Sequence, residues 1–281
     1  MVGDLYQSTT GRSTTPLMLR EALQNCGAHD CSVLFVHAGI NFGAPRSRRT
    51  ELLQAMTDTL LQLGPATICF PAFTFSFVNH EVFDQQNTPS RMGVLSEYFR
   101  RLPDTLRSAD PLMSVAVSGR RSDLALAIGT QSCGQDSTFD MLSRTDGVRF
   151  LFLGVRPQDC FTYMHYLEWH VQAPYRHNRD FHGMIQSGNQ STASTATLFV
   201  RYPGVYPGPG NAQYERQMAD NQIMLTHPFG DNFIHCVPES TAKALWLQLY
   251  HRDPNFFITS PFARPLTIPA NFEHTLPMVA M

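Results

Sequence analysis

An alternation of short apolar runs with amphipathic helical segments constrains the fold of this chain more than any other feature. Val33-Leu34-Phe35-Val36 is apolar at every position, which is typical of a strand covered on both faces. Residues 52–63 place leucines and a methionine on one face of a helix that Gly64-Pro65 ends, and Thr67-Ile68-Cys69-Phe70 is the next expected buried strand. A strand, a helix and a strand in this order form a βαβ unit. The sequence therefore predicts an α/β fold with a central mixed, largely parallel sheet flanked by helices.

The same alternation continues along most of the chain. Helices are expected at 17–26, 92–102, 121–128, around His165 and at 239–250, and further strands at 113–117, 150–154 and 197–202. The polar residues 1–15 suggest a loose arm, residues 172–212 an excursion from the main sheet, and the proline-rich residues 260–281 an extended tail. A chain of 281 residues has the length of one domain with insertions, so we expect a single domain over 1–281.

Composition argues against several classes of protein. The formal net charge of −2 argues against nucleic acid as the main partner. No apolar stretch is long enough to cross a membrane, and the N-terminus lacks the basic head and apolar run of a signal peptide. The six cysteines form no CxxC pair and no metal-type spacing, so we expect reduced thiols in a cytoplasmic protein.

One segment carries a candidate for acid–base chemistry. His165 and Glu168 are three positions apart in a stretch that can be helical, which puts them on one helix face. A carboxylate there can hold one imidazole nitrogen and leave the other free to take a proton, as a general base requires. A buried histidine that is only satisfied by its neighbour remains the structural alternative.

Small, hydroxyl and basic residues follow the expected strands, where ligands bind in open α/β sheets. His37-Ala38-Gly39 follows the first strand, and in 70–77 hydroxyls alternate with aromatic rings, a lining that suits a thin ligand with amide groups. Arg46, Arg48 and Arg49 precede a helix, an arrangement that favours phosphate; a solvated basic loop is the alternative. Neither GxGxxG nor GxxxxGK[ST] is present.

These segments, taken in order over residues 15–255, resemble the antibiotic N-acetyltransferase family, whose best-known members are the aminoglycoside 3-N-acetyltransferases. The resemblance is carried by seven segments: 36–39, 71–77, 87–97, 107–111, 152–155, 162–168 and 174–176. It implies the fold of that family, which differs from the GNAT fold, and acetyl transfer from acetyl-CoA to an amine without a metal. It also implies that His165 and Glu168 are the catalytic pair.

The resemblance implies further that the loop after the first strand and two later positions hold CoA. The expected CoA-binding residues are His37, Ala38, Gly39, Arg46, Thr74, Phe75 and Ser114. Two departures are visible. Ala38 and Gly39 stand where resistance enzymes tend to have two serines, and Asp110-Pro111-Leu112-Met113-Ser114 stands where they tend to read His-Pro-Thr-His-Ser. The second departure resembles relatives that act on sugar amines in polysaccharide or natural-product pathways.

The acceptor is therefore expected to be an amino sugar or an aminoglycoside-like amine, in a resistance, biosynthetic or polysaccharide setting. Candidate acceptor contacts are Glu81, Asp84 and Glu97 for a cationic group, Arg176 for a carboxylate or phosphate, and the rings of Tyr166 and Tyr175. Solvated charges, ion pairs or simple packing are the structural alternatives. A homodimer is a further expectation.

Three rival functions stay open at this point. Cys160 is an alternative acyl-enzyme nucleophile. His165, Glu168, His170, His177 and His182 are close enough in sequence to raise metal-assisted hydrolysis, although no HExxH is present. The third rival is a CoA- or sugar-binding module without activity, since a fold does not fix a function.

Overall fold

A seven-stranded sheet with the strand order β12-β13-β9-β3-β5-β8-β7 forms the centre of the protein. The computed structural model describes residues 3–126 and 129–263. The strands of this sheet are β3 (Val33–Ala38), β5 (Thr67–Pro71), β7 (Leu106–Arg107), β8 (Val115–Gly119), β9 (Val148–Leu153), β12 (Leu225–Phe229) and β13 (Asn232–Pro238). The mixed α/β class predicted from the sequence is confirmed.

Parallel pairing is confined to the middle of this sheet. β3 pairs in parallel with β9 and β5, whereas β8, β7, β13 and β12 join by antiparallel pairs. The expectation of a largely parallel sheet was therefore wrong. A strand buried on both faces is apolar throughout whichever way it runs, so the apolar pattern at 113–117 could not reveal its direction.

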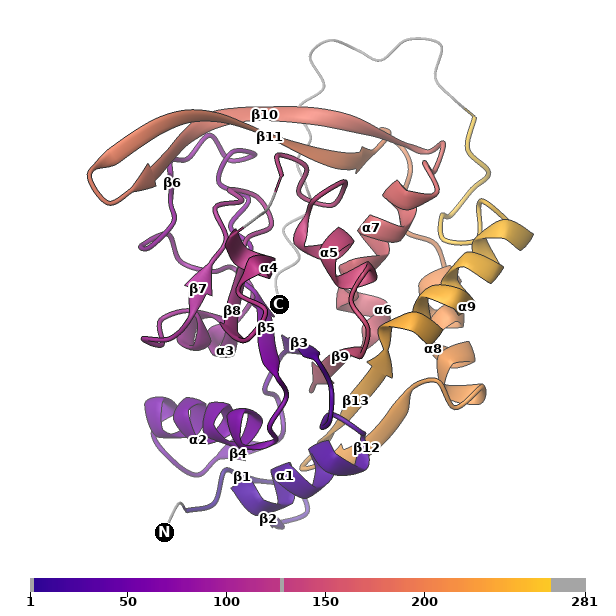
Figure 1. Cartoon of the computed structure of the whole chain (residues 1–281). Coiled ribbons are helices and arrows are strands. Elements are labelled where there is room, and N and C mark those ends of the chain that lie inside the picture. Colours follow the sequence, from indigo (N-terminus) through magenta and orange to yellow (C-terminus); the bar gives the residue numbers. More distant parts are fainter. Residues whose placement is uncertain (1–2, 127–128, 264–281) are drawn as a thin grey trace.

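Helices cover both faces of the sheet (Figure 1). Alternate residues of β3 belong to two different cores. Leu34 and Val36 pack on the side of α1 (Pro16–Asn25), α2 (Arg49–Gln62) and α3 (Val94–Phe99). Val33 and Phe35 face the larger core, to which the remaining helices contribute. These are α4 (Asp123–Leu126), α5 (Thr138–Ser143), α6 (Pro157–Cys160), α7 (Tyr163–His170), α8 (Gly210–Asp220) and α9 (Glu239–Arg252).

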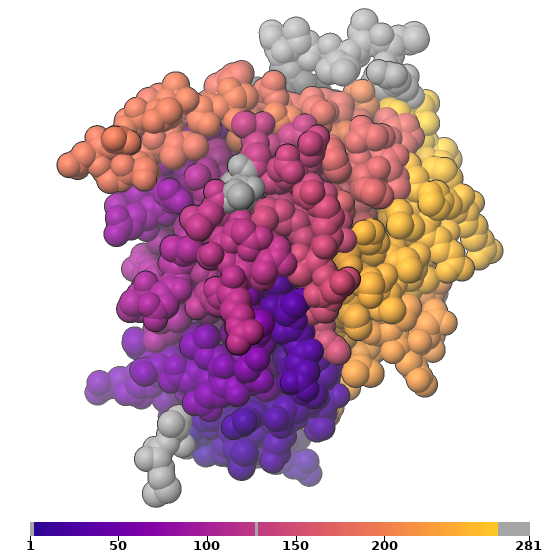
Figure 2. Space-filling model, viewed as in Figure 1, coloured from indigo at the N-terminus to yellow at the C-terminus, as the bar shows by residue number. Residues whose placement is uncertain are grey.

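A long two-stranded ribbon lies apart from the main sheet, across the top of Figure 1. It consists of β10 (Arg176–Ser187) and β11 (Gln190–Arg201), with the short β6 (Phe83–Asp84) along β10. Figure 2 shows its far end projecting beyond the body of the molecule. The ribbon accounts for much of the 172–212 segment that the sequence placed outside the main sheet.

The N-terminal residues are packed in place. β1 (Tyr6–Gln7), β2 (Ser13–Thr14) and β4 (Ala44–Pro45) form a small sheet, and the Tyr6 hydroxyl donates to the Ile40 carbonyl at 3.0 Å. The loose arm expected at 1–15 was therefore wrong, because Leu5 and Tyr6 are buried and anchor an otherwise polar stretch. Most of the expected 260–281 tail lies outside the described residues. Within the described ranges, no helix combines the length and apolarity needed to cross a membrane.

Candidate active site

The His165–Glu168 pair is formed on one face of α7. The His165 Nδ1 lies 3.2 Å from Glu168 Oε2. The imidazole side chain is 35% exposed, whereas that of Glu168 is 2% exposed. Nε2 has no hydrogen-bond partner among the described residues, so a solvent-reachable ring stands over a buried carboxylate.

Glu168 is surrounded by donors from three parts of the chain. The Tyr175 hydroxyl donates to Oε1 at 3.2 Å, Arg176 forms a very short ion pair with Oε2, and Arg201 lies 3.8 Å from Oε1. Burial alone would raise the pKa of Glu168. The charges of Arg176 and Arg201, with a smaller contribution from His165, instead hold this pKa well below its ordinary value. Glu168 is thus an ionised orienting group and is too weakly basic to accept the proton itself. We call His165, Glu168, Tyr175, Arg176 and Arg201 the His165 cluster.

Arg176 also touches the imidazole. Its Nη2 is 2.9 Å from His165 Nδ1, and its Nη1 donates to the Phe199 carbonyl at 2.6 Å. Burial and then the Arg176 charge lower the pKa of His165, while Glu168 opposes them. The net lowering keeps the ring neutral near pH 7, the form that can accept a proton.

The expected ligand-binding edge of the sheet is built as a single rim. In the strand register, Ala38 of β3 lies beside Leu153 of β9, and Pro71 of β5 lies beside Val115 of β8. Because β8 runs antiparallel to β5, it is the beginning of β8 that meets the ends of the other strands. The rim therefore brings His37, Gly39, Thr74, Phe75 and Ser114 to one edge.

The hydroxyls at this rim are already engaged. Thr74 Oγ1 donates to the Pro111 carbonyl at 2.8 Å, and Ser114 Oγ donates to the Ala72 carbonyl at 2.6 Å. The Ser114 proton is thus committed to a backbone acceptor and is not free to stabilise an oxyanion. Phe75 has φ 54°, a conformation that is costly for an aromatic residue and that typically occurs at functional sites.

His37 and Gly39 differ in how tightly they are packed. The His37 ring stacks on Phe152, and its Nε2 is buried without a partner among the described residues. Burial lowers the pKa of His37 to about 3, so the ring is neutral. A Cβ on Gly39 would lie 2.4 Å from Val155 Cγ1, so this position has no room for a serine without a shift. Packing against Val155 thus accounts for a glycine at this position.

A cavity of about 600 Å³ opens beside Gly39. Its lining includes Gly39, Ile40, Asn41, Arg49 and Val94, so it runs from the end of β3 to the first residue of α2. Arg46 is exposed on the preceding loop and is not among the lining residues, whereas Arg49 is. The basic segment that the sequence assigned to phosphate thus reaches this cavity through Arg49.

The segment 111–113 contacts both the rim and the loop that carries Cys133. Thr74 bonds to Pro111, and nearby the Cys133 thiol lies 3.1 Å from the Met113 sulfur. Burial raises the pKa of that thiol, and the charges of Arg176 and Glu168 also act on it. The structure therefore shows a neutral imidazole beside a buried carboxylate, and a ligand-sized cavity that opens beside Gly39 after β3.

Comparison with known proteins identifies this arrangement. A family model described as aminoglycoside 3-N-acetyltransferase matches residues 35–244. This chain belongs to that family. It is therefore an acyltransferase of the N-acetyltransferase type, for which acetyl-CoA is the typical co-substrate.

Solved structures share the fold. Aminoglycoside acetyltransferase AAC(3)-IVa, as apoenzyme, is 24% identical with a TM-score of 0.70, covering 88% of this chain and 92% of its own. AAC-IIIb, in a binary complex with CoASH, is 18% identical with a TM-score of 0.73, covering 89% and 99%. The YokD protein from Bacillus subtilis is 15% identical with a TM-score of 0.69, covering 86% and 94%. No curated protein matches the sequence.

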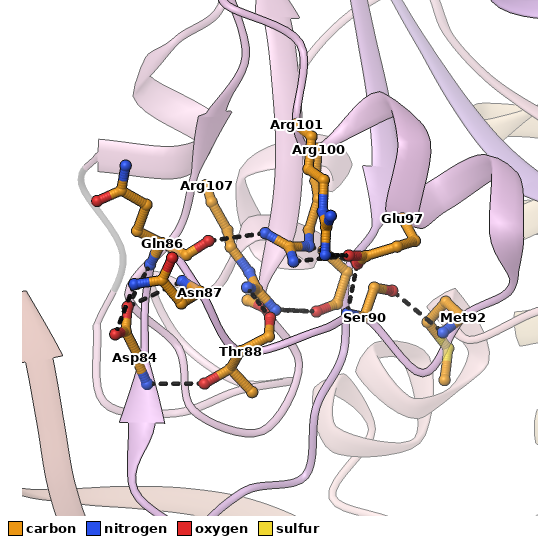
Figure 3. Close-up of polar contacts among 12 residues, drawn as sticks. Asp84, Gln86, Asn87, Thr88, Ser90, Met92, Glu97, Arg100, Arg101 and Arg107 are labelled. Atoms are coloured by element: carbon orange, nitrogen blue, oxygen red, sulfur yellow. Dashed lines mark hydrogen bonds and ion pairs between the residues drawn. The ribbon is translucent and has the colours of Figure 1, made fainter. Parts of the chain in front are cut away.

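The 87–97 segment of this N-acetyltransferase is held by a second group of arginines (Figure 3). Arg107 donates to the Thr88 carbonyl at 2.5 Å and to the Ala72 carbonyl at 2.8 Å. Arg100 forms a two-pronged pair with Glu97, whose Oε2 also accepts from the Ser90 N–H at 2.7 Å. We call Ser90, Glu97, Arg100, Arg101 and Arg107 the Arg107 cluster. Sequence reasoning did not identify it, because all the carbonyls that accept from Arg107 and Arg100 are backbone groups, which carry no sequence signal.

The acidic residues proposed for acceptor binding are each engaged locally. Glu81 pairs with Arg91 at 3.1 Å. Asp84 accepts from the backbone N–H groups of Gln86 and Asn87, and Glu97 belongs to the Arg107 cluster. None of these three contacts the His165 cluster in the part of the chain that the structure describes. The structure thus gives them the role of holding their own loop together.

The aromatic and cysteine candidates are turned away from solvent. The Tyr166 hydroxyl bonds to Ser143 at 2.7 Å and to Asp140 at 3.1 Å, and Tyr175 is buried under Glu168, so neither ring offers a free face to a sugar. Cys160 Sγ lies 3.3 Å from the Arg156 carbonyl, and burial raises its pKa to about 12. Among the described residues, no group of three or more His, Cys, Asp or Glu could hold a metal ion.

Proposed function

We propose that this protein transfers an acetyl group from acetyl-CoA to the amine of an amino sugar or aminoglycoside-like acceptor, with His165 as general base. One observation carries the proposal. His165 is a solvent-reachable neutral imidazole whose Nδ1 is occupied by a buried, ionised Glu168 and whose Nε2 is unpaired among the described residues. That is the arrangement a base needs beside a thioester.

The reaction balances around this ring. The reactive form is the tautomer with its hydrogen on Nδ1, which donates to Glu168. A guanidinium has no acceptor, so in this form Arg176 Nη2 bonds to Glu168 and not to Nδ1. Nε2 then takes a proton from the acceptor nitrogen as that nitrogen attacks the thioester carbonyl carbon. A new C–N bond forms, the C–S bond breaks, and CoA leaves as thiolate that the imidazolium can reprotonate. Because Ser114 donates to Ala72, we assign stabilisation of the oxyanion to backbone N–H groups.

The rim supports a CoA site. The unpaired His37 Nε2 would be satisfied by an amide of the pantetheine arm, and the cavity lined by Gly39 and Arg49, of about 600 Å³, offers a cation for the phosphate end. In this proposal Ala38, Thr74 and Phe75 shape the rim through their backbone. AAC-IIIb has been solved with CoASH, and AAC-VIa with sisomicin. Cytoplasmic location and a homodimer stay predictions.

The acyl-enzyme alternative finds less support. A thiol whose pKa is raised to about 12 is almost entirely protonated at neutral pH, and the thiolate is the nucleophile. The inactive CoA-binding alternative is tested directly by turnover.

The test replaces His165 by Ala and measures release of free thiol with a panel of amino sugars and aminoglycosides. We expect kcat to fall by ~10²–10⁴-fold, because general-base help of that size is lost, with CoA affinity nearly unchanged. His170→Ala, an exposed histidine on the same helix, is the matched control and should retain activity. Unchanged turnover in His165→Ala would overturn the proposal, and CoA binding without turnover on any amine would favour the binding module.

A further inference from the structure

Arg176 has a place in the His165 cluster that the general-base scheme does not use. Its Nη2 contacts both Glu168 Oε2 and His165 Nδ1, the latter at 2.9 Å. Its side chain is only 5% exposed, so the guanidinium faces the catalytic pair and the ribbon backbone and is screened from an acceptor in solvent.

We infer that Arg176 is a positioning residue for acetyl transfer: it holds Glu168 beneath the imidazole and fixes a positive charge beside Nδ1. The inference rests on the proposed role of His165 as base and adds to it the group that sets how basic the ring is. It replaces the acceptor-binding role that the sequence suggested for Arg176.

The ribbon anchors the guanidinium of Arg176. Arg176 is the first residue of β10 and lies opposite Arg201, the last residue of β11, in the strand register. Its Nη1 donates to the Phe199 carbonyl of β11, so the ribbon fixes the guanidinium. Its Nη2 forms the ion pair with the Glu168 carboxylate. A planar fork can make both contacts at once, which a lysine ammonium on a flexible stem cannot.

The charge of Arg176 acts on the imidazole as well. A guanidinium remains protonated at all relevant pH values, so a positive charge beside Nδ1 opposes formation of the imidazolium. The groups that face His165 are Glu168 of α7, Tyr175 before β10, Arg176 of β10 and Arg201 of β11. Two cations thus oppose one carboxylate. Burial and the Arg176 charge together outweigh the attraction of Glu168, and the pKa of His165 is lowered.

Neighbouring thiols and phenols do not change this balance. Burial raises the pKa of the Cys133 thiol and of the Tyr175 hydroxyl, so both groups stay neutral near the cluster. The pKa of Tyr250, on α9, is likewise raised by burial and by the charge of Glu168. The charged groups that bear on the His165 pKa are therefore Glu168, Arg176 and Arg201.

The experiment compares the wild type with Arg176→Gln and Arg176→Lys. The His165 ring is titrated by NMR in the free protein, and kcat is measured against pH. In Arg176→Gln we expect the His165 pKa to rise and the acid limb of the kcat profile to move to higher pH. In Arg176→Lys the positive charge stays, so the pKa should remain near wild type. Its kcat should fall roughly 10–100-fold, as happens when groups that orient catalytic histidines are lost.

Arg179→Gln is the matched control, because Arg179 lies on the same strand with its guanidinium over the Phe181 ring. It should change neither the titration nor kcat. If Arg176→Gln does not fold, Arg176→Lys decides: full kcat in this variant, or a raised His165 pKa, overturns the inference. An unmoved pKa in folded Arg176→Gln also overturns it. Failure of the proposed function would appear elsewhere, as turnover surviving in His165→Ala.

Discussion

The molecule contains two arginine–glutamate clusters that differ in what they leave unpaired. In the Arg107 cluster, Arg100 and Arg101 pair with Glu97 while Arg107 donates to backbone carbonyls. In the His165 cluster, the same types of charge surround Glu168, but the ring nitrogen opposite Glu168 has no partner among the described residues. The types of charge are the same, although Glu97 is 23% exposed and Glu168 only 2%. What distinguishes a reactive cluster is one titratable atom that the fold holds in place and leaves unsatisfied.

The sharpest test of this comparison replaces the glutamate of each cluster. Glu168→Ala leaves Arg176 and Arg201 without their carboxylate partner. We expect it to lower the free energy of unfolding by about 3–5 kcal/mol. Turnover per folded molecule should fall a further ~10²-fold or more, because the ring loses its orienting partner. Denaturant unfolding and thiol-release assays give the two quantities.

Glu97→Ala serves as the matched variant of the other cluster. Its side chain is 23% exposed, so the loss of stability should be smaller, and turnover per folded molecule should stay near wild type. Equal losses of turnover in the two variants would remove the distinction between the clusters.

The next largest effect is expected at Arg107. Arg107→Met removes donors to the carbonyls of Thr88 and Ala72 and leaves them buried, which should cost about 2–4 kcal/mol of unfolding free energy. Arg101→Met is the control, since its side chain is 63% exposed although it also pairs with Glu97. It should cost less than about 1 kcal/mol. Chemical denaturation of both variants measures the difference. An unchanged unfolding free energy in Arg107→Met would mean that the Arg107 cluster does not hold the 87–97 segment.

A smaller loss of stability is expected from crowding at Gly39. Gly39→Ala brings a Cβ within 2.4 Å of the undisturbed Val155 Cγ1 position, so crowding should cost about 1–3 kcal/mol. Val155→Ala in the same chain should recover part of this loss, and the double-mutant cycle isolates the contact. A purely additive pair would show that Gly39 is needed for another reason, such as access of a ligand to the backbone.

The smallest effect is the pH dependence of stability from His165. Its folded pKa is lowered from 6.5, so below pH 6.5 the unfolded chain binds a proton that the folded chain does not. Unfolding free energy should therefore fall as pH decreases from 6.5 towards the folded pKa, and this component should be absent in His165→Ala. Glu168 and Glu97 have lowered pKa values, so their contributions persist above about pH 4 and are lost only in stronger acid. Thermal unfolding at several pH values compares the variants; identical slopes in the wild type and His165→Ala would contradict a lowered His165 pKa.

Much of the site could be predicted from the sequence because its signals are local. The three-residue spacing of His165 and Glu168 fixes their shared helix face, and small residues after apolar runs mark the rim. The partners that set the chemistry were not predictable. Arg201 reaches Glu168 from a distant segment, and the Phe199 carbonyl holds Arg176 in the same way. The burial of Arg176 and Tyr175 depends on where the ribbon packs. The same limit explains why Glu81 and Asp84 resembled acceptor ligands.

The sequence by itself determined the α/β class, the family resemblance and the candidate base, since periodicity, composition and ordered motifs are properties of neighbouring residues. Only the tertiary structure decided the direction of β8, the anchoring of residues 5–14 and the enclosure of Glu168 by two arginines. Strand direction and ion pairing depend on contacts between segments far apart in the chain. The free energy of burying a charge depends on which oppositely charged residue the fold places beside it. That is also why Arg176 became a candidate positioning residue only once the ribbon was in place.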